Sequence, residues 1–179
     1  ERQYWGYCTN TFTEEKKQYV YGRFMGLQEN FNYFNNVTGK SILDIGGGPS
    51  SMLLKTWGFK RGRVVDPIKW PDWVKARYAM INIDLVESSG EEINESGWDE
   101  VWIYNCLQHV VDPQKIINNA KRAAPVLRIF EWIDIPPYEG HPHMLTQKGL
   151  ESWIGQPGQV AEIDETDEPG KCFYGVFTF

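Results

Sequence analysis

The sequence predicts an α/β protein: a three-layer αβα sandwich around a mostly parallel sheet of seven strands. Short apolar runs alternate with helix-like segments over 41–132, which favours parallel strands joined by right-handed crossovers. Three consecutive glycines follow the first of these runs. The last two runs, 160–164 and 172–179, have no helix between them, so we expect them to close the sheet as an antiparallel β-hairpin.

The N-terminal segment, 1–40, is expected to precede the sandwich domain, 41–179. Residues 1–12 are aromatic and polar without a clear period. Two glutamates follow Thr13, which is typical of a helix N-terminus because the helix dipole favours acids there. A helix is therefore predicted over 13–35. The aromatic residues before it either fold over a binding site as a lid or are buried against the helix at the edge of the sheet.

The elements of the sandwich follow from the apolar pattern and its end signals. Before the hairpin, strands are expected at 41–45, 63–65, 78–83, 98–104 and 126–132. Helices are expected at 50–57, 113–123 and 146–154, with Gly58 ending the first and Thr146 capping the last. A long loop, 134–145, follows the fifth strand, and an acidic turn, 165–170, joins the two strands of the hairpin.

Composition and charge limit the classes of function. A length of 179 residues suits one domain, and a net charge of −6 disfavours binding to nucleic acid. A local basic patch (Lys55, Lys60, Arg61 and Arg63) keeps that alternative open. Three widely spaced cysteines are typical of reduced thiols, and no run is long and apolar enough to span a membrane. We therefore expect a cytoplasmic protein, and the sequence sets no oligomeric state.

The turn at 44–50 (DIGGGPS) carries the main functional signal. A strand, a glycine-rich turn and a helix together bind adenosyl cofactors at the carboxyl edge of a parallel sheet. Ser51 stands where a dinucleotide fingerprint has its third glycine, and the carboxylate of Asp44 would repel a pyrophosphate. The same carboxylate attracts the ammonium of a methionine group. The turn therefore favours S-adenosylmethionine over NAD.

Acids at the next two strand ends extend this predicted site. Asp66 ends the second predicted strand and can accept hydrogen bonds from both ribose hydroxyls. Asp84 ends the third and can accept from an adenine amino group. The alternative is that Asp44 caps its helix and that the other two are ordinary loop acids. The expected cofactor-binding residues are Asp44, Gly46, Gly47, Gly48, Asp66, Pro67, Asp84, Leu85, Asn105, Leu107 and Gln108.

At these residues the chain resembles the class I S-adenosylmethionine-dependent methyltransferases, a Rossmann-like family. LDIGGGPS is similar to the first motif of that family, VVDP to the second, and LQHVVDP to the segment after the fourth strand. The resemblance runs from Ser41 to the C-terminus and implies methyl transfer to oxygen or nitrogen of a small molecule, leaving S-adenosylhomocysteine. Two positions depart from the family: Gln108 stands where Glu is frequent, and Ala124-Pro125 replaces the usual Pro-Gly-Gly.

Three histidines are the candidate bases for removing a proton from the acceptor. His109 follows the fourth predicted strand and acts either as a base or as a packing residue. His141 and His143 lie in the loop 134–145 and act as base, substrate contact or lid anchor. No metal is expected, because these two histidines with Asp134 and Glu139 nearby lack a third fixed ligand.

Three other functions stay open at the level of sequence. The chain could methylate nucleic acid, bind S-adenosylmethionine without catalysis as a sensor or scaffold, or use a nicotinamide cofactor. The stretch 104–107 reads YNCL rather than an NPPY-type motif, which disfavours methylation of exocyclic amines on bases.

Overall fold

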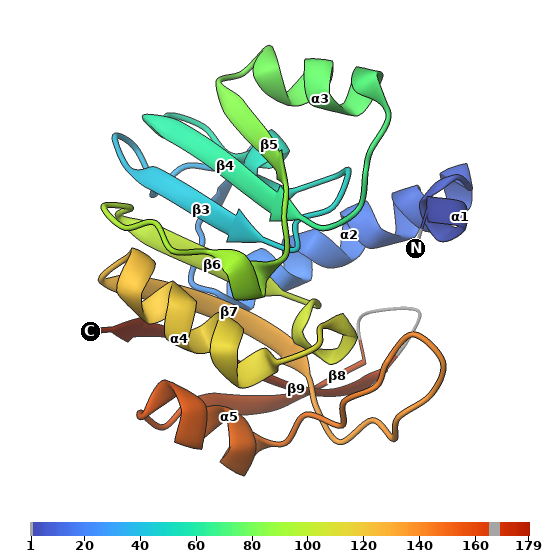
Figure 1. Ribbon diagram of the computed structural model, residues 1–179, viewed down its shortest axis with the longest axis vertical. Coiled ribbons are helices and arrows are strands. Elements are labelled where there is room, and N and C mark those ends of the chain that lie inside the picture. The colour runs from blue at the N-terminus through green and yellow to red at the C-terminus, as the bar shows by residue number, and fades with distance from the viewer. Residues whose placement is uncertain (1, 165–168) are drawn as a thin grey trace.

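A mixed seven-stranded sheet forms the centre of the computed structural model, which describes residues 2–164 and 169–179 (Figure 1). Its strands are β3 Ser41–Ile45, β4 Arg61–Asp66, β5 Ile83–Glu87, β6 Glu100–Tyr104, β7 Val126–Trp132, β8 Gln159–Ile163 and β9 Gly170–Thr178. Their order is β5-β4-β3-β6-β7-β9-β8, with β9 antiparallel to both of its neighbours and the other pairs parallel. The predicted fold class is confirmed.

Helices cover both faces of this sheet. They are α1 Arg2–Trp5, α2 Cys8–Phe24, α3 Asp72–Ala79, α4 Pro113–Ala123 and α5 Gln147–Ile154, together with the 3-10 turns η1 Met52–Lys55, η2 Gly90–Glu92 and η3 Leu107–His109. Strand residues alternate between two hydrophobic cores, because successive side chains of a strand point to opposite faces. One core joins α4 and α5 to the sheet, and the other joins α2 and α3 to it.

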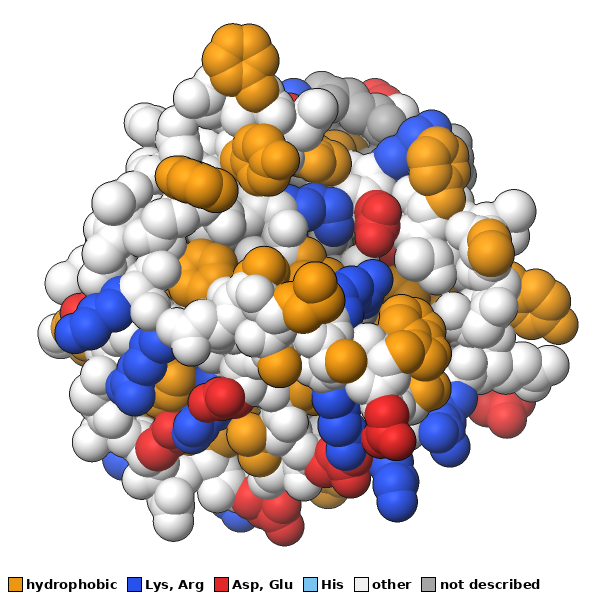
Figure 2. All heavy atoms as spheres, turned by 90° about the horizontal axis from the view of Figure 1, so that it is seen from above, with side chains coloured by type: hydrophobic (Ala, Val, Ile, Leu, Met, Phe, Trp, Pro, Cys, Tyr) orange, Lys and Arg blue, Asp and Glu red, His pale blue; other side chains and the backbone are white. Residues whose placement is uncertain are grey.

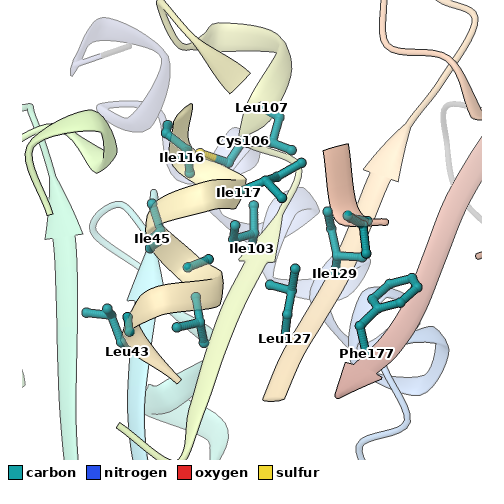
Figure 3. Close-up of a cluster of buried hydrophobic side chains, with 14 of the residues drawn as sticks. Leu43, Ile45, Ile103, Cys106, Leu107, Ile116, Ile117, Leu127, Ile129 and Phe177 are labelled. Atoms are coloured by element: carbon teal, nitrogen blue, oxygen red, sulfur yellow. The ribbon is translucent and has the colours of Figure 1, made fainter. Parts of the chain in front are cut away.

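The core beneath α4 fixes the strands that carry the candidate site. Ile116 and Ile117 of α4 lie against Ile45 of β3 and Ile103 of β6 (Figure 3). The helix begins where predicted, since the Asp112 side chain accepts a hydrogen bond from the Lys115 amide at 2.9 Å. The predicted limits of β3, β7 and α4 are also confirmed, as is the Thr146 cap of α5.

The predicted helix over 13–35 is wrong at both ends. Helix α2 begins at Cys8, and the chain leaves it at Gly26, which has a φ of +70°. Arg128 in β7 donates to the Met25 carbonyl at 2.8 Å and so holds the helix end against the sheet. The following residues instead form a hairpin, β1 Glu29–Asn30 with β2 Tyr33–Phe34.

The helix predicted over 50–57 is reduced to the 3-10 turn η1. The Ser51 side chain caps this turn by accepting from the Leu53 amide at 3.0 Å. Thr56 then forms a β-bridge with Phe34, in which the Trp57 amide donates to the Phe34 carbonyl at 2.8 Å. A longer helix is therefore incompatible with the pairing that follows it.

The strand predicted over 78–83 is also wrong. Helix α3 continues to Ala79, the chain turns at Asn82 with a φ of +61°, and only then does it enter β5 at Ile83. The acidic turn predicted at 165–170 falls mostly on residues 165–168, which lie outside the described residues. No helix among those described is long and apolar enough to cross a membrane.

Candidate functional site

The glycine turn joins β3 to η1 at the carboxyl edge of the sheet. Gly46 has a φ of +77°, and a side chain on it would overlap the sulfur of Cys106. A Cβ on Gly47 would lie 2.5 Å from Asp44 Oδ2. The glycines thus bring the backbone of this turn close to the loop after β6 on one side and to a carboxylate on the other.

Asp44 lies beneath this turn and is fully buried. Its Oδ2 accepts hydrogen bonds from Tyr104 Oη at 2.6 Å and from Ser51 Oγ, whereas Oδ1 has no hydrogen-bond partner among the described residues. Burial raises the pKa of Asp44 to about 7, although these two hydrogen bonds lower it in part. A positive charge placed beside Oδ1 would favour the ionised form.

Two buried tyrosines hold the turn from outside. Tyr104 at the end of β6 accepts from the Met52 amide at 3.0 Å while it donates to Asp44. Tyr78 of α3 accepts from the Ser51 amide and donates to the Gly48 carbonyl, both at 2.8 Å. Burial raises the pKa of both tyrosines, so they stay protonated donors. Sequence reasoning missed both residues, because their partners in the glycine turn are distant in the sequence.

Asp66 ends β4 and lies next to the glycine turn. Its Oδ2 accepts from the Gly48 amide at 3.2 Å, and its Oδ1 accepts from the Ile68 amide at 2.9 Å and from Trp70 Nε1 at 3.0 Å. Asp66 is only 6% exposed, and through these hydrogen bonds it organises the loop after β4 as well as the turn. Its contact with a ribose stays a prediction.

The structure does not bring Asp84 to this edge. Asp84 is the second residue of β5 and pairs with Arg63 at 3.1 Å, with 70% of its side chain exposed. The expectation that it ends the third strand is wrong because β5 begins at Ile83. Leu85 likewise lies within the strand and packs against the core that contains α3. The residue paired with Asp66 at the end of β5 is Glu87, which forms an ion pair with Lys75.

A buried acid fixes the loop after β6. Glu131 Oε1 accepts from the Cys106 and Leu107 amides, each at 3.1 Å. Glu131 is fully buried, and this raises its pKa to about 8. Asn105 has a φ of +47° and accepts from Gln108 Nε2 at 2.8 Å. The predicted residues of this loop thus lie together, and sequence reasoning missed Glu131, which fixes them.

The three histidines lie where the loop 134–145 packs on the loop after β6. The rings of His109 and His141 are 4.2 Å apart between centroids, and Tyr138 Oη lies 3.0 Å from His141 Nε2. His109 Nδ1 donates to the Gly140 carbonyl at 2.7 Å, and His143 Nε2 donates to the Val110 carbonyl at 2.8 Å. His109 and His143 therefore join the two loops.

The N-terminal helix α1 lies at the carboxyl edge (Figure 1). The Trp5 ring would be 3.8 Å from a Cβ on Gly48, so it covers the glycine turn closely. Tyr4 Oη donates to Glu14 Oε1 at 2.9 Å and ties α1 to α2. This geometry fits a lid over the turn.

No family model and no curated protein matches the sequence significantly. Solved structures nevertheless match the fold over most of the chain. The N-methyltransferase NodS from Bradyrhizobium japonicum has a TM-score of 0.65 and 14% identity, over 93% of this chain and 96% of that one. The chain has the class I methyltransferase fold.

Two further structures with this fold support the comparison. A methyltransferase from Aquifex aeolicus has a TM-score of 0.56 and 15% identity, over 90% of this chain and 89% of that one. The 1,6-didemethyltoxoflavin N1-methyltransferase from Burkholderia thailandensis, solved with bound 1,6-didemethyltoxoflavin and S-adenosylhomocysteine, has a TM-score of 0.61 and 15% identity. That match covers 90% of this chain and 76% of the other. At these identities the likeness concerns the fold.

Proposed function

We propose that the chain is an S-adenosylmethionine-dependent methyltransferase that transfers a methyl group to oxygen or nitrogen of a small molecule. The observation that carries this proposal is Asp44, a fully buried carboxylate beneath a glycine turn with one oxygen lacking a partner among the described residues. An uncompensated buried acid is costly, and a cationic ligand offsets that cost. The ammonium of a methionine group is such a cation.

The other residues of the turn suit the same cofactor. Gly46 and Gly48 leave the backbone open to close approach, and Asp66 on the neighbouring strand is the candidate partner of the ribose hydroxyls. The buried loop residues Leu107 and Gln108 are the candidate adenine contacts. When bound, S-adenosylmethionine supplies a methyl group on a positively charged sulfur.

The remaining task of the chain is to position an acceptor and exclude water. Helix α1, with Trp5 over Gly48, is the proposed lid. His109 and His141 share one cluster beside the loop after β6, and their action as bases stays a prediction. We assign His143 to holding the loop, since its Nε2 donates to the Val110 carbonyl. The net charge of −6 favours a small acceptor over nucleic acid.

Calorimetric titration with S-adenosylmethionine, S-adenosylhomocysteine and NADH tests the proposal. We expect the first two to bind and NADH not to bind. The Asp44→Asn variant should bind S-adenosylmethionine at least tenfold more weakly, because it loses a charge-assisted contact with the ammonium. Asp84→Asn is the matched control. It removes a carboxylate of β5 that lies outside the proposed site, so the affinity of this variant for S-adenosylmethionine should equal that of the wild type.

Binding of NADH without S-adenosylmethionine would overturn the proposal. Equal affinity of the Asp44→Asn variant and the wild type would remove the observation on which it rests. Tight cofactor binding with no methyl transfer to any small acceptor would instead support a binding module.

A further inference from the structure

A cavity of about 270 Å³ lies between α1, the glycine turn and the beginning of α3. Pro49 and Ser50 line it, so it adjoins the segment that continues the glycine turn. Its volume approaches that of sites for small ligands, which are typically concave and mostly apolar. Of the roles assigned above, that of Trp5 in the proposed lid borders this space, and no ligand has been assigned to it.

Three indole rings line the cavity, those of Trp5, Trp70 and Trp73. Trp70 is buried, and its ring is fixed because Nε1 donates to Asp66. Trp73 on α3 is 62% exposed, and it belongs to neither of the hydrophobic cores on the two faces of the sheet. Flat rings of this kind stack on a planar aromatic ligand, with a gain beyond simple burial.

The charged groups of the cavity are basic. Arg2 and Arg77 line it, and none of the described residues that line it is acidic. Arg77 donates to the Pro49 carbonyl, its guanidinium carbon lies 5.5 Å from the centre of the Trp73 ring, and its Nε is buried with no partner within 2–164 and 169–179. Figure 2, which views the molecule from the α3 side, shows Lys and Arg side chains next to hydrophobic ones on this face.

We propose that this cavity binds a planar aromatic ring that carries a negative charge, as a carboxylate or phenolate does. This assignment rests on the proposed function: the ligand of the cavity is the methyl acceptor. The acceptor oxygen forms the new bond to the methyl carbon, and the sulfur keeps the electron pair of the broken S–C bond. The negative charge of the acceptor and the positive charge of the sulfonium cancel, so no proton has to be removed.

An acceptor of this kind needs no base, and none of the described residues that line the cavity is an acid or a histidine. An acceptor that is already ionised needs positioning by rings and guanidinium groups, and the cavity offers both. An acceptor that needs no base also agrees with the positions of His109 and His143, which donate hydrogen bonds to backbone carbonyls. These histidines then serve loop packing, and the acceptor lies on the α1 and α3 side of the glycine turn.

Titration of the full chain with 4-hydroxybenzoate, followed by tryptophan fluorescence, tests the site. The matched neutral probe is 4-hydroxybenzamide. We expect the acid to bind at least tenfold more tightly than the amide, and saturating S-adenosylhomocysteine not to displace it. Arg77→Gln and Trp73→Ala should each weaken binding of the acid about tenfold. Trp57→Ala is the control, because Trp57 is 69% exposed and does not line the cavity.

Each outcome bears on the inference. Absent binding, equal binding of acid and amide, or variants that bind like the wild type would overturn it. Displacement by S-adenosylhomocysteine would also overturn it, because the cavity would then belong to the cofactor site. If S-adenosylhomocysteine binds and the aromatic acids do not, this inference fails while the proposed function stands. If the acids bind beside bound S-adenosylmethionine and no methyl group is transferred to them, the cavity is a binding site but the assignment of its ligand as the acceptor fails, while the proposed function stands.

Discussion

Replacing Asp44 with asparagine should make the protein more stable at pH 8, although it changes a buried, hydrogen-bonded residue. In the folded protein the pKa of Asp44 is raised from its ordinary 3.8 to about 7, and burial is the main cause. Between about pH 4 and pH 7, the Asp44 carboxyl is therefore protonated in the folded protein and ionised in the unfolded chain. The contribution of Asp44 to stability is then greatest at or below pH 4 and falls as the pH rises to about 7.

The magnitude follows from the size of the shift. A rise of about three pKa units corresponds to roughly 4 kcal/mol at 1.36 kcal/mol per unit, which is an upper limit for the penalty at pH 8. Asparagine cannot ionise, and its oxygen still accepts from Tyr104 and Ser51. We therefore expect a gain of about 1–4 kcal/mol at pH 8 and little gain at pH 4.

Urea unfolding of the wild type and the Asp44→Asn variant at pH 4, 6 and 8 measures this difference directly. The comparison at each pH cancels the titration of groups that both proteins share. Asp84→Asn, an exposed change of the same chemistry, should shift stability by less than about 1 kcal/mol at each pH. A variant less stable than the wild type at pH 8 would refute the reasoning, because Asp44 would then be stabilised in its ionised form.

Three further predictions concern the same edge of the sheet. Binding of S-adenosylmethionine should tighten as the pH rises toward about 7 and should release a proton, measured by calorimetry in buffers of different ionisation enthalpy, since the ammonium selects ionised Asp44. Glu131→Ala should cost about 2–4 kcal/mol in urea unfolding, because two buried amides lose their acceptor, whereas Glu131→Gln should cost less than about 1 kcal/mol. Asp66→Ala should weaken cofactor binding by about 2–4 kcal/mol and also lower the melting temperature, because it removes three hydrogen bonds within the chain; a stable variant of unchanged affinity would contradict both roles.

The parts of the fold that the sequence predicted are those set by local signals. β3 and β7 are apolar runs with clear ends, and α4 begins with an Asp-Pro pair, so pattern and cap agree. The helix over 13–35 failed because its end depends on Arg128, which is 103 residues away from Met25. The run 78–83 failed because it joins the end of a helix to the start of a strand, and a short apolar run does not distinguish the two.

The residues of the candidate site likewise fall into those that local signals predict and those that they do not. Asp44 and Asp66 were predictable because each is one of the last two residues of a strand next to a recognisable turn. Tyr104, Tyr78 and Glu131 were not, because their roles come from partners that are distant in the sequence: 60 residues separate Tyr104 from Asp44, and 25 separate Glu131 from Cys106. Contacts of this length depend on the order of the strands, which the local pattern does not encode.

The way the glycine turn is held has a functional consequence. In a strand–turn–helix site the first turn of a helix usually presents free amides to the ligand. Here the amides of Ser51 and Met52 are taken by Tyr78 and Tyr104. Anion binding by these amides is thereby removed, while the carboxylate of Asp44 remains beneath the turn. The turn is thus built to favour a cation over a phosphate, which is the physical ground for preferring S-adenosylmethionine to a dinucleotide at this site.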